Sequence, residues 1–169
     1  MAGKTTNSNT VLLKTNYGDI SIELYPDKAP RTVENFLNYT RAGTYDGTVF
    51  HRVITGFMIQ GGGFDEAGDQ RKTNTPIKLE SNNGLKNEKG TVAMARTSAP
   101  DSATDQFFIN LADNEFLNYG ARDDGYAVFG RVVKGMDVVE KIGMVKTTTK
   151  NRMSDWPVEE VVIEKATIA

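Results

Sequence analysis

Hydrophobic and polar residues alternate in two short runs near the N-terminus. Val11, Leu13 and Thr15 alternate with their neighbours in the first run, and Ile20, Ile22 and Leu24 alternate in the second. The intervening Asn16-Tyr17-Gly18-Asp19 has the composition of a turn. A period of two is typical of a half-buried strand, so these runs predict a β-hairpin. Residues 1–9 are polar and unpatterned, and we predict a flexible tail before one domain over residues 10–169.

The spacing changes to that of a helix between residues 27 and 43. Pro30 suits the first turn of a helix, and Gly43 suits its end. Between them, side chains recur at intervals of three and four residues: Val33, Phe36, Leu37 and Thr40. This pattern predicts one helix, and a similar pattern predicts a second over residues 135–142. A final strand is expected over residues 158–168.

The middle of the chain, residues 49–129, contains short strand-like runs separated by clusters of Gly, Asn, Asp and Pro. Asn82-Asn83-Gly84 and Glu88-Lys89-Gly90 are two such turn sequences. Many short strands and two helices far apart in the chain predict a mainly β protein. A closed or nearly closed antiparallel sheet satisfies that pattern.

Composition narrows the possible functions. A chain of 169 residues is long enough for one well-packed domain. The formal net charge of −2 gives no basic surface for nucleic acid, and no apolar run is long enough to span a bilayer. One histidine and no cysteine make disulfides and transition-metal sites improbable. Because there is neither a cysteine nor an apolar signal segment at the N-terminus, we expect a cytoplasmic protein.

The segment over residues 50–64 contains the most specific chemistry. It places the single histidine, His51, beside Arg52 in a run of β-branched and aromatic residues that ends in three glycines. Alternation should put Phe57 and Ile59 on one face of a strand and Met58 and Gln60 on the other. A twist or bulge near the glycines could bring both sets toward one groove. An arginine and an amide beside an apolar groove suit a neutral, amide-containing ligand, although an ordinary strand with solvated His51 and Arg52 is the alternative.

This segment resembles the cyclophilin family of peptidyl-prolyl cis-trans isomerases. Residues 90–96 together with 102–110 resemble the family's other groove wall, and residues 126–132 resemble a third segment, all in the family's order. The resemblance extends from about Thr10 to the C-terminus. It implies a closed eight-stranded antiparallel barrel, capped by two helices, with its substrate groove on the outside.

The resemblance also implies roles for individual residues. The expected catalytic group is Arg52, Gln60 and His51. Within this group, Gln60 would orient either the arginine or the substrate carbonyl, and His51 would lie at the rim. The expected substrate-binding group is Phe57, Met58, Ala95, Arg96, Gln106, Phe108, Phe116, Leu117 and Tyr126. Expected partners are proline-containing peptides and unfolded proteins, bound by a monomer without cofactor or metal.

Rotation about a peptide bond needs no nucleophile. Its barrier of about 18–20 kcal/mol comes from amide resonance, which is lost as the prolyl nitrogen becomes pyramidal. Arg52 is always charged and has several N–H donors, so it could donate a hydrogen bond to that nitrogen. Its charge should keep the neighbouring His51 neutral. A non-catalytic module that binds proline peptides is the alternative function, and it would not require the arginine.

Three positions depart from the best-known eukaryotic members of the family. Phe116 stands in place of a tryptophan, Tyr126 in place of a histidine and Arg96 in place of an asparagine. These departures indicate the bacterial-type branch. The resemblance implies that the tryptophan gives its indole N–H to the inhibitor cyclosporin, so we expect weak cyclosporin binding here. Arg96 is expected to contact peptide through its backbone.

Overall fold

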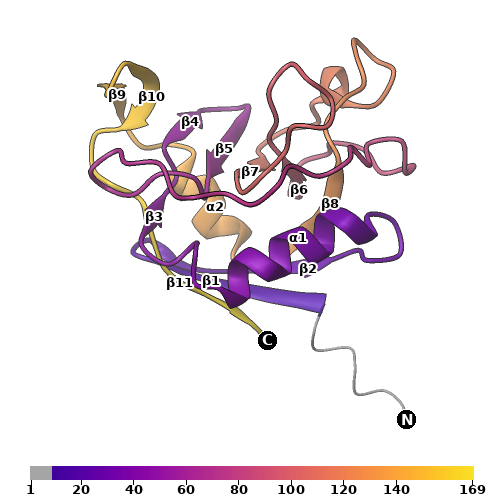
Figure 1. Cartoon of the computed structure of the whole chain (residues 1–169). Coiled ribbons are helices and arrows are strands. Elements are labelled where there is room, and N and C mark those ends of the chain that lie inside the picture. The colour runs from indigo at the N-terminus through magenta and orange to yellow at the C-terminus, as the bar shows by residue number, and fades with distance from the viewer. Residues whose placement is uncertain (1–8) are drawn as a thin grey trace.

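The computed structural model describes residues 9–169, and it contains one large antiparallel sheet, a separate hairpin and two helices (Figure 1). The large sheet has nine strands in the order β3-β11-β1-β2-β8-β6-β7-β5-β4. These strands are β1 (Thr10–Thr15), β2 (Gly18–Leu24), β3 (Thr48–Val49), β4 (Arg52–Ile54), β5 (Met58–Gly61), β6 (Thr91–Met94), β7 (Phe107–Asn110), β8 (Val128–Lys134) and β11 (Val162–Ile168). The hairpin pairs β9 (Thr147–Lys150) with β10 (Met153–Pro157). Of the predicted N-terminal tail, residues 1–8 lie outside the described residues.

The predicted N-terminal hairpin is confirmed. β1 and β2 pair so that Val11 faces Ile22 and Leu13 faces Ile20, and all four side chains are completely buried. The hairpin lies between β11 and β8 in the sheet. The alternating pattern of the hairpin therefore reflects a sheet that packs one of its faces against the core.

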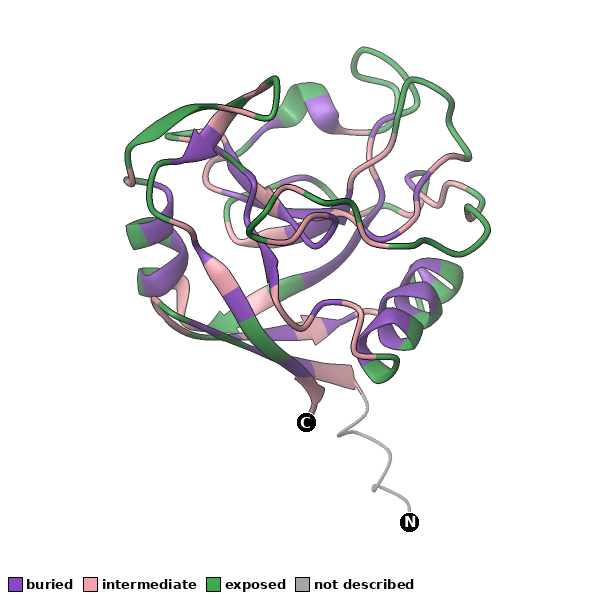
Figure 2. Cartoon of the chain, turned by 60° about the vertical axis from the view of Figure 1, so that its left-hand side comes forward, coloured by how far each residue is buried: buried purple, intermediate pink, exposed green. Residues whose placement is uncertain are grey.

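Both predicted helices are present, and they lie on opposite sides of the curled sheet (Figure 2). α1 (Pro30–Arg41) has its proline in the first turn and is followed by Gly43 with φ of 75°. The backbone N–H groups at its start donate to the carboxylate of Glu80, at 3.1 and 2.7 Å. α2 (Met136–Ile142) follows Gly135, whose φ of 91° favours glycine. Neither helix in residues 9–169 is long and apolar enough to cross a membrane.

The core lies inside the curl of the sheet and is closed by aromatic rings. Phe36 from α1 packs against Tyr45, Phe107 and Phe129, with ring centroids 5.0 to 5.3 Å apart. Phe50 joins the same cluster through Phe107 at 5.9 Å. These five rings are completely buried, so they join α1 and the two sides of the sheet into one packed interior.

The expected fold class is confirmed in its general form, a curled antiparallel sheet with two helices, but the count of eight strands is wrong. The sheet has nine strands, and its end strands are β3 and β4. These two do not pair in a ladder, and residues 50–51, which belong to no regular element, connect them. Val49 of β3 instead bonds across to the chain after β5: its N–H donates to the Phe64 carbonyl at 2.9 Å, and its carbonyl accepts from Gly62 N–H at 3.4 Å.

The last predicted strand begins later than expected, and the hairpin before it was not predicted. β11 starts at Val162 rather than at residue 158. The β9–β10 hairpin contains Asn151, Arg152 and Asp155 at positive φ, and its register shifts before Trp156. Such an irregular backbone breaks the period of two, so alternation along the sequence could not show these strands.

Candidate functional site

Four neighbouring strands place one side chain each in a row across the outer face of the sheet. Arg52 on β4 is opposite Gln60 on β5, Gln60 is opposite Phe108 on β7, and Phe108 is opposite Ala93 on β6. Side chains that face one another across paired strands project from the same side of the sheet. The ladder therefore brings an arginine, an amide and an aromatic ring together from segments far apart in the chain.

The next row along the same strands points the opposite way. Val53, Ile59, Ile109 and Val92 occupy successive strands and belong to the buried core. The predicted alternation of Met58, Ile59 and Gln60 is confirmed by this arrangement. The prediction for Phe57 is wrong: it does not share the face of Ile59, because β5 begins only at Met58 and Phe57 lies in the preceding turn.

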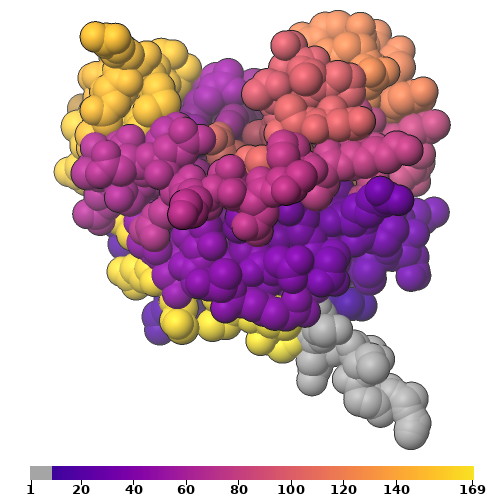
Figure 3. Space-filling view, in the orientation of Figure 1, coloured from indigo at the N-terminus to yellow at the C-terminus, as the bar shows by residue number. Residues whose placement is uncertain are grey.

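The outer row borders a cavity of about 370 Å³. In Figure 3 the surface is recessed between the purple segment of β4 and β5 and the orange loops around residues 115–125. The residues that line the cavity are Arg52, Phe57, Met58, Gln60, Ala95, Arg96, Phe108, Phe116, Leu117, Arg122 and Tyr126. All the predicted site residues except His51 and Gln106 are among them, and Arg122 is an addition that the sequence did not indicate.

The Arg52 guanidinium is positioned by Gln60, and Gln60 is in turn positioned by Gln106. Arg52 Nη1 donates to Gln60 Oε1 at 3.2 Å, and Gln60 Nε2 donates to Gln106 Oε1 at 2.9 Å. Gln106 therefore acts behind Gln60 rather than on the cavity wall, in space that the absence of a side chain at Gly63 leaves open. The hydrogen bond to Gln60 orients the guanidinium and occupies only one of its donors.

Apolar side chains form the floor and one wall of the cavity. Met58, Phe108 and Leu117 are almost completely buried beneath it. Phe57 stacks on Phe116 with centroids 5.6 Å apart and planes inclined by 26°. A small saturated ring can bury its surface here while its amide lies near the arginine. The cavity thus has the two parts needed to hold a proline and its preceding peptide bond.

Comparison with known proteins decides the family. The model of the cyclophilin type peptidyl-prolyl cis-trans isomerase family matches residues 10–168. The chain belongs to the cyclophilin family. It is 56% identical over 162 residues to peptidyl-prolyl cis-trans isomerase B of Escherichia coli K12, covering 94% of this chain and 99% of that protein.

Two further relatives agree with this assignment. Peptidyl-prolyl cis-trans isomerase A of Dickeya dadantii is 54% identical over 163 residues, 96% of this chain and 86% of its own. Among solved structures, a Cryptosporidium parvum cyclophilin crystallised in the presence of the dipeptide Ala-Pro matches with a TM-score of 0.78 and 29% identity, over 95% of this chain and 98% of that one. The protein is thus a peptidyl-prolyl cis-trans isomerase.

The rim position expected for His51 is wrong in this cyclophilin. Its side chain is buried, with its ring 4.7 Å from Phe64 and 5.8 Å from Trp156 between centroids. Neighbouring residues of an extended chain point in opposite directions, so Arg52 reaches the cavity and His51 points away from it. Burial lowers the pKa of His51 to about 4, with a smaller contribution from the charge of Arg52. The imidazole is neutral, as expected, but burial is the main cause.

Arg96 uses its guanidinium inside the protein. Its side chain is only 4% exposed, and it donates from Nε to the Gly125 carbonyl at 2.9 Å and from Nη1 to the Thr97 carbonyl at 2.8 Å. The guanidinium also lies 4.7 Å from the centroid of the Tyr126 ring. These contacts fasten the loop before β8 to the end of β6, so little of the charged group is left for a ligand.

Three buried asparagines form a chain of amides beneath the cavity. Asn114 Nδ2 donates to Asn110 Oδ1 at 2.8 Å, and Asn110 Nδ2 donates to Asn87 Oδ1 at 3.1 Å. Asn110 also donates to the Thr91 hydroxyl at 3.0 Å. Side-chain donors and acceptors are thus paired within the chain, which is what a buried polar group requires.

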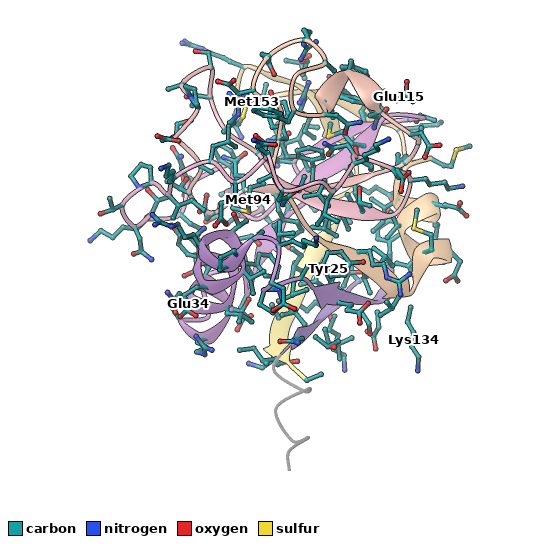
Figure 4. All side chains as sticks on the ribbon, turned by 90° about the vertical axis from the view of Figure 1, so that its right-hand side faces the viewer. Tyr25, Glu34, Met94, Glu115, Lys134 and Met153 are labelled. Carbon is teal, nitrogen blue, oxygen red and sulfur yellow. The ribbon has the colours of Figure 1, made fainter. Side chains whose placement is uncertain are left out.

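Both ends of this asparagine chain hold residues of the cavity wall. Asn114 Nδ2 donates to the Phe57 carbonyl at 2.9 Å, and Asn87 Nδ2 donates to the carbonyls of Leu117 and Tyr126 at 3.2 and 3.4 Å. The wall segment includes the 3₁₀ turn Glu115–Leu117, and Glu115 lies at the upper side of Figure 4, far from Glu34 of α1 below. Sequence analysis did not predict these hydrogen bonds, because no periodicity or spacing along the chain links the three asparagines.

The cavity holds no acidic side chain. Its charged lining residues are Arg52, Arg96 and Arg122. In the described part of the chain, no group of three or more His, Cys, Asp or Glu side chains could hold a metal ion. The arrangement is therefore one of hydrogen-bond donors around an apolar pocket.

Proposed function

We propose that Arg52 catalyses rotation about the X–Pro bond by donating a hydrogen bond to the prolyl nitrogen in the twisted state. The observation that carries this role is the position of the guanidinium, which borders the apolar pocket and keeps N–H donors free beyond its bond to Gln60. In the planar amide the nitrogen lone pair is delocalised and accepts poorly. In the twisted amide the lone pair is localised, so the donor binds the transition state more strongly than the ground state.

The remaining groove residues hold the substrate. Phe57, Met58, Phe108 and Leu117 bury the proline ring, and Ala95 with the backbone of Arg96 contacts the neighbouring peptide. One charge-assisted hydrogen bond contributes about 1.5–3 kcal/mol, or roughly 10- to 150-fold in rate. Fixing the ring and the carbonyl side must contribute the rest of the acceleration.

We extend the proposal to partners and setting. The substrates are proline-containing segments of peptides and unfolded proteins, in keeping with the Ala-Pro dipeptide of the Cryptosporidium parvum structure. The protein acts as a cytoplasmic monomer that assists folding. Cyclosporin binds weakly, because Phe116 has no indole N–H. The curled sheet works as the closed barrel of the family, supported by the bonds of Val49 across its two ends.

Replacement of Arg52 tests the catalytic role. For Arg52→Ala we expect kcat to fall by roughly 10- to 150-fold while KM changes little, because the lost interaction belongs to the twisted state. Arg52→Lys should restore only part of kcat, since a point charge lacks the planar set of donors. The measurement is steady-state isomerisation of an Ala-Pro-Phe peptide, with circular dichroism to verify the fold.

Arg131→Ala is the control, because Arg131 is an exposed arginine on β8 outside the cavity. It should leave both kinetic constants unchanged. If Arg52→Ala turned over near the unmodified rate, the proposed role of the arginine would be wrong, and catalysis would have to come from how the groove holds the proline ring and the carbonyl side. A non-catalytic proline-peptide binding module, the alternative function, would instead show no isomerisation by the unmodified protein.

A further inference from the structure

Arg122 lies on the rim of the cavity against an aromatic ring. Its guanidinium carbon is 5.3 Å from the centroid of Phe116, whose ring in turn stacks on Phe57. Arg122 comes from the loop between the 3₁₀ turn and β8, and it lines the same cavity as Arg52. A planar guanidinium over an aromatic ring keeps its edges free for hydrogen bonding.

The charge of Arg122 is only loosely paired, in a long contact with one carboxylate. Its side chain is 57% exposed, and the nearest carboxylate oxygen, Asp123 Oδ2, is 3.9 Å from Nε, beyond hydrogen-bonding distance. The other oxygen of Asp123 accepts from Gly125 N–H at 2.8 Å and lies 3.6 Å from Arg96 Nη2. One carboxylate is therefore shared between two arginines, and the donors of Arg122 face the cavity and solvent.

The cavity as a whole is cationic, although the chain has a formal net charge of −2. Arg52 and Arg122 are both exposed cations on its lining, which contains no carboxylate. The acidic neighbours in sequence, Glu115 and Asp124, are exposed and lie outside the lining. A carboxylate brought into this space is attracted by both guanidinium groups, and an ammonium group is repelled by both.

We propose that Arg122 is a specificity-determining residue that favours substrates with an acidic side chain close to the proline. The inference rests on the proposed binding of the proline ring against Phe57 and Phe108, since only then do flanking side chains reach the rim. Because the pair is exposed to solvent, the preference for Glu over Gln in KM should be about two- to five-fold at low salt. It should shrink as ionic strength rises.

Two peptide series measure the preference. In the first series the residue directly before the proline is Glu, Gln or Lys. In the second series the varied residue lies two positions after the proline. The rest of the Ala-Pro-Phe peptide is identical within each series. We expect KM to rise in the order Glu, Gln, Lys in at least one series. Arg122→Ala should remove most of the difference in KM between the Glu and Gln peptides, leaving the part that is due to Arg52, and Arg122→Glu should reverse the order.

Arg131→Glu is the matched control, because Arg131 has the same 57% exposure and its own carboxylate partner, Glu23, but lies outside the cavity. It should leave the order of the peptides unchanged. Equal KM for Glu and Gln peptides in the unmodified protein, an undiminished preference in Arg122→Ala, or an equal loss of the preference in Arg131→Glu would each overturn the inference. Failure of the proposed function itself would look different, because Arg52→Ala would then turn over the Gln peptide near the unmodified rate while the unmodified protein could still distinguish Glu from Gln.

Discussion

Phe107 and Phe108 are neighbours on β7, have the same side chain and are both buried, yet they belong to different parts of the molecule. Phe107 is completely buried among Phe36, Tyr45 and Phe50 in the closed core. Phe108 is 4% exposed, contacts Tyr126 edge-on and lines the cavity. Burial alone therefore does not separate a structural ring from a binding ring. The difference is whether the outer face of the ring packs against other side chains, as in Phe107, or borders the cavity, as in Phe108.

The two regions also differ in how they treat polar groups. Around the core within the curl of the sheet, buried polar groups bond singly to backbone carbonyls, as the Tyr45 hydroxyl does to the Asp105 carbonyl at 2.8 Å and Asn35 Nδ2 does to the Thr104 carbonyl at 2.7 Å. Beneath the groove, by contrast, the asparagine chain of residues 87, 110 and 114 is buried and hydrogen-bonded. A binding wall has to keep its shape when no ligand fills it, and directional amide bonds maintain that shape where packing from one side is missing.

The largest expected effect comes from comparing Phe107→Ala with Phe108→Ala. Loss of the core ring should lower the free energy of unfolding by about 3–5 kcal/mol and leave KM of the folded fraction unchanged. Loss of the groove ring should cost less stability, because part of its surface already faces the cavity, and should raise KM. Urea unfolding and steady-state kinetics measure the two quantities. Equal changes of KM in both variants would show that the two faces of β7 are not functionally distinct.

Two buried ionisable groups should give opposite pH dependences of stability. Burial lowers the pKa of His51 to about 4 and raises the pKa of Asp105 to about 6. The stability contributed by neutral His51 is complete above its ordinary pKa of 6.5 and is lost as pH falls toward 4. Protonated Asp105 is favoured in the fold, so its contribution is complete below 3.8 and is lost as pH rises through 6.

Each contribution is on the order of 3 kcal/mol at most, since one pKa unit corresponds to about 1.4 kcal/mol. In the unmodified protein the two slopes oppose each other between pH 4 and 6 and should leave a nearly flat profile from these two groups. Asp105→Asn should become more stable above pH 6 and gain a rising profile, whereas His51→Gln should gain a falling one. Urea unfolding at pH 4.5, 5.5, 6.5 and 7.5 tests this; parallel profiles in both variants would contradict it.

The smallest expected effect concerns the rim rather than the floor of the groove. Phe116 is 43% exposed and has no hydrogen-bond donor, so one carbonyl of bound cyclosporin should lack a partner, at a cost of roughly 1–3 kcal/mol. Phe116→Trp should therefore tighten cyclosporin inhibition while peptide turnover is retained. Tyr119→Trp is the control, because Tyr119 is an exposed ring outside the cavity lining. Tight inhibition of the unmodified protein that tryptophan at position 116 does not improve would refute the argument.

The parts of the fold with a regular period could be predicted from the sequence. The hairpin of β1 and β2, both helices and the alternation from Met58 to Gln60 all follow from it. The β9–β10 hairpin could not be predicted, because three residues at positive φ and a register shift disturb its period. The count of eight strands came from the family resemblance, and the two-residue strand β3 at one end of the sheet is among the nine that the sheet contains.

The site could be predicted only as far as resemblance and local alternation extend. They identified Arg52, Gln60 and the apolar lining, but they placed His51 at the rim. The direction of His51 depends on where β4 begins, a detail that a one-residue difference reverses. Arg122 was missed because its distance from Phe116 and the cavity depends on the path of an irregular loop.

The asparagine chain has a consequence for how such a sequence can change over generations. An apolar replacement of Asn110 would remove a hydrogen-bond partner from both Asn87 and Asn114, and replacement of either end residue would remove one from Asn110, at about 1–3 kcal/mol for each group left unpaired. That is a large part of the 5–15 kcal/mol by which a typical domain is stable. The order of substitutions then matters, because a second change is tolerated only after the first has altered its neighbours. We expect these three positions to be inherited as a set, with intermediate combinations rare among related chains.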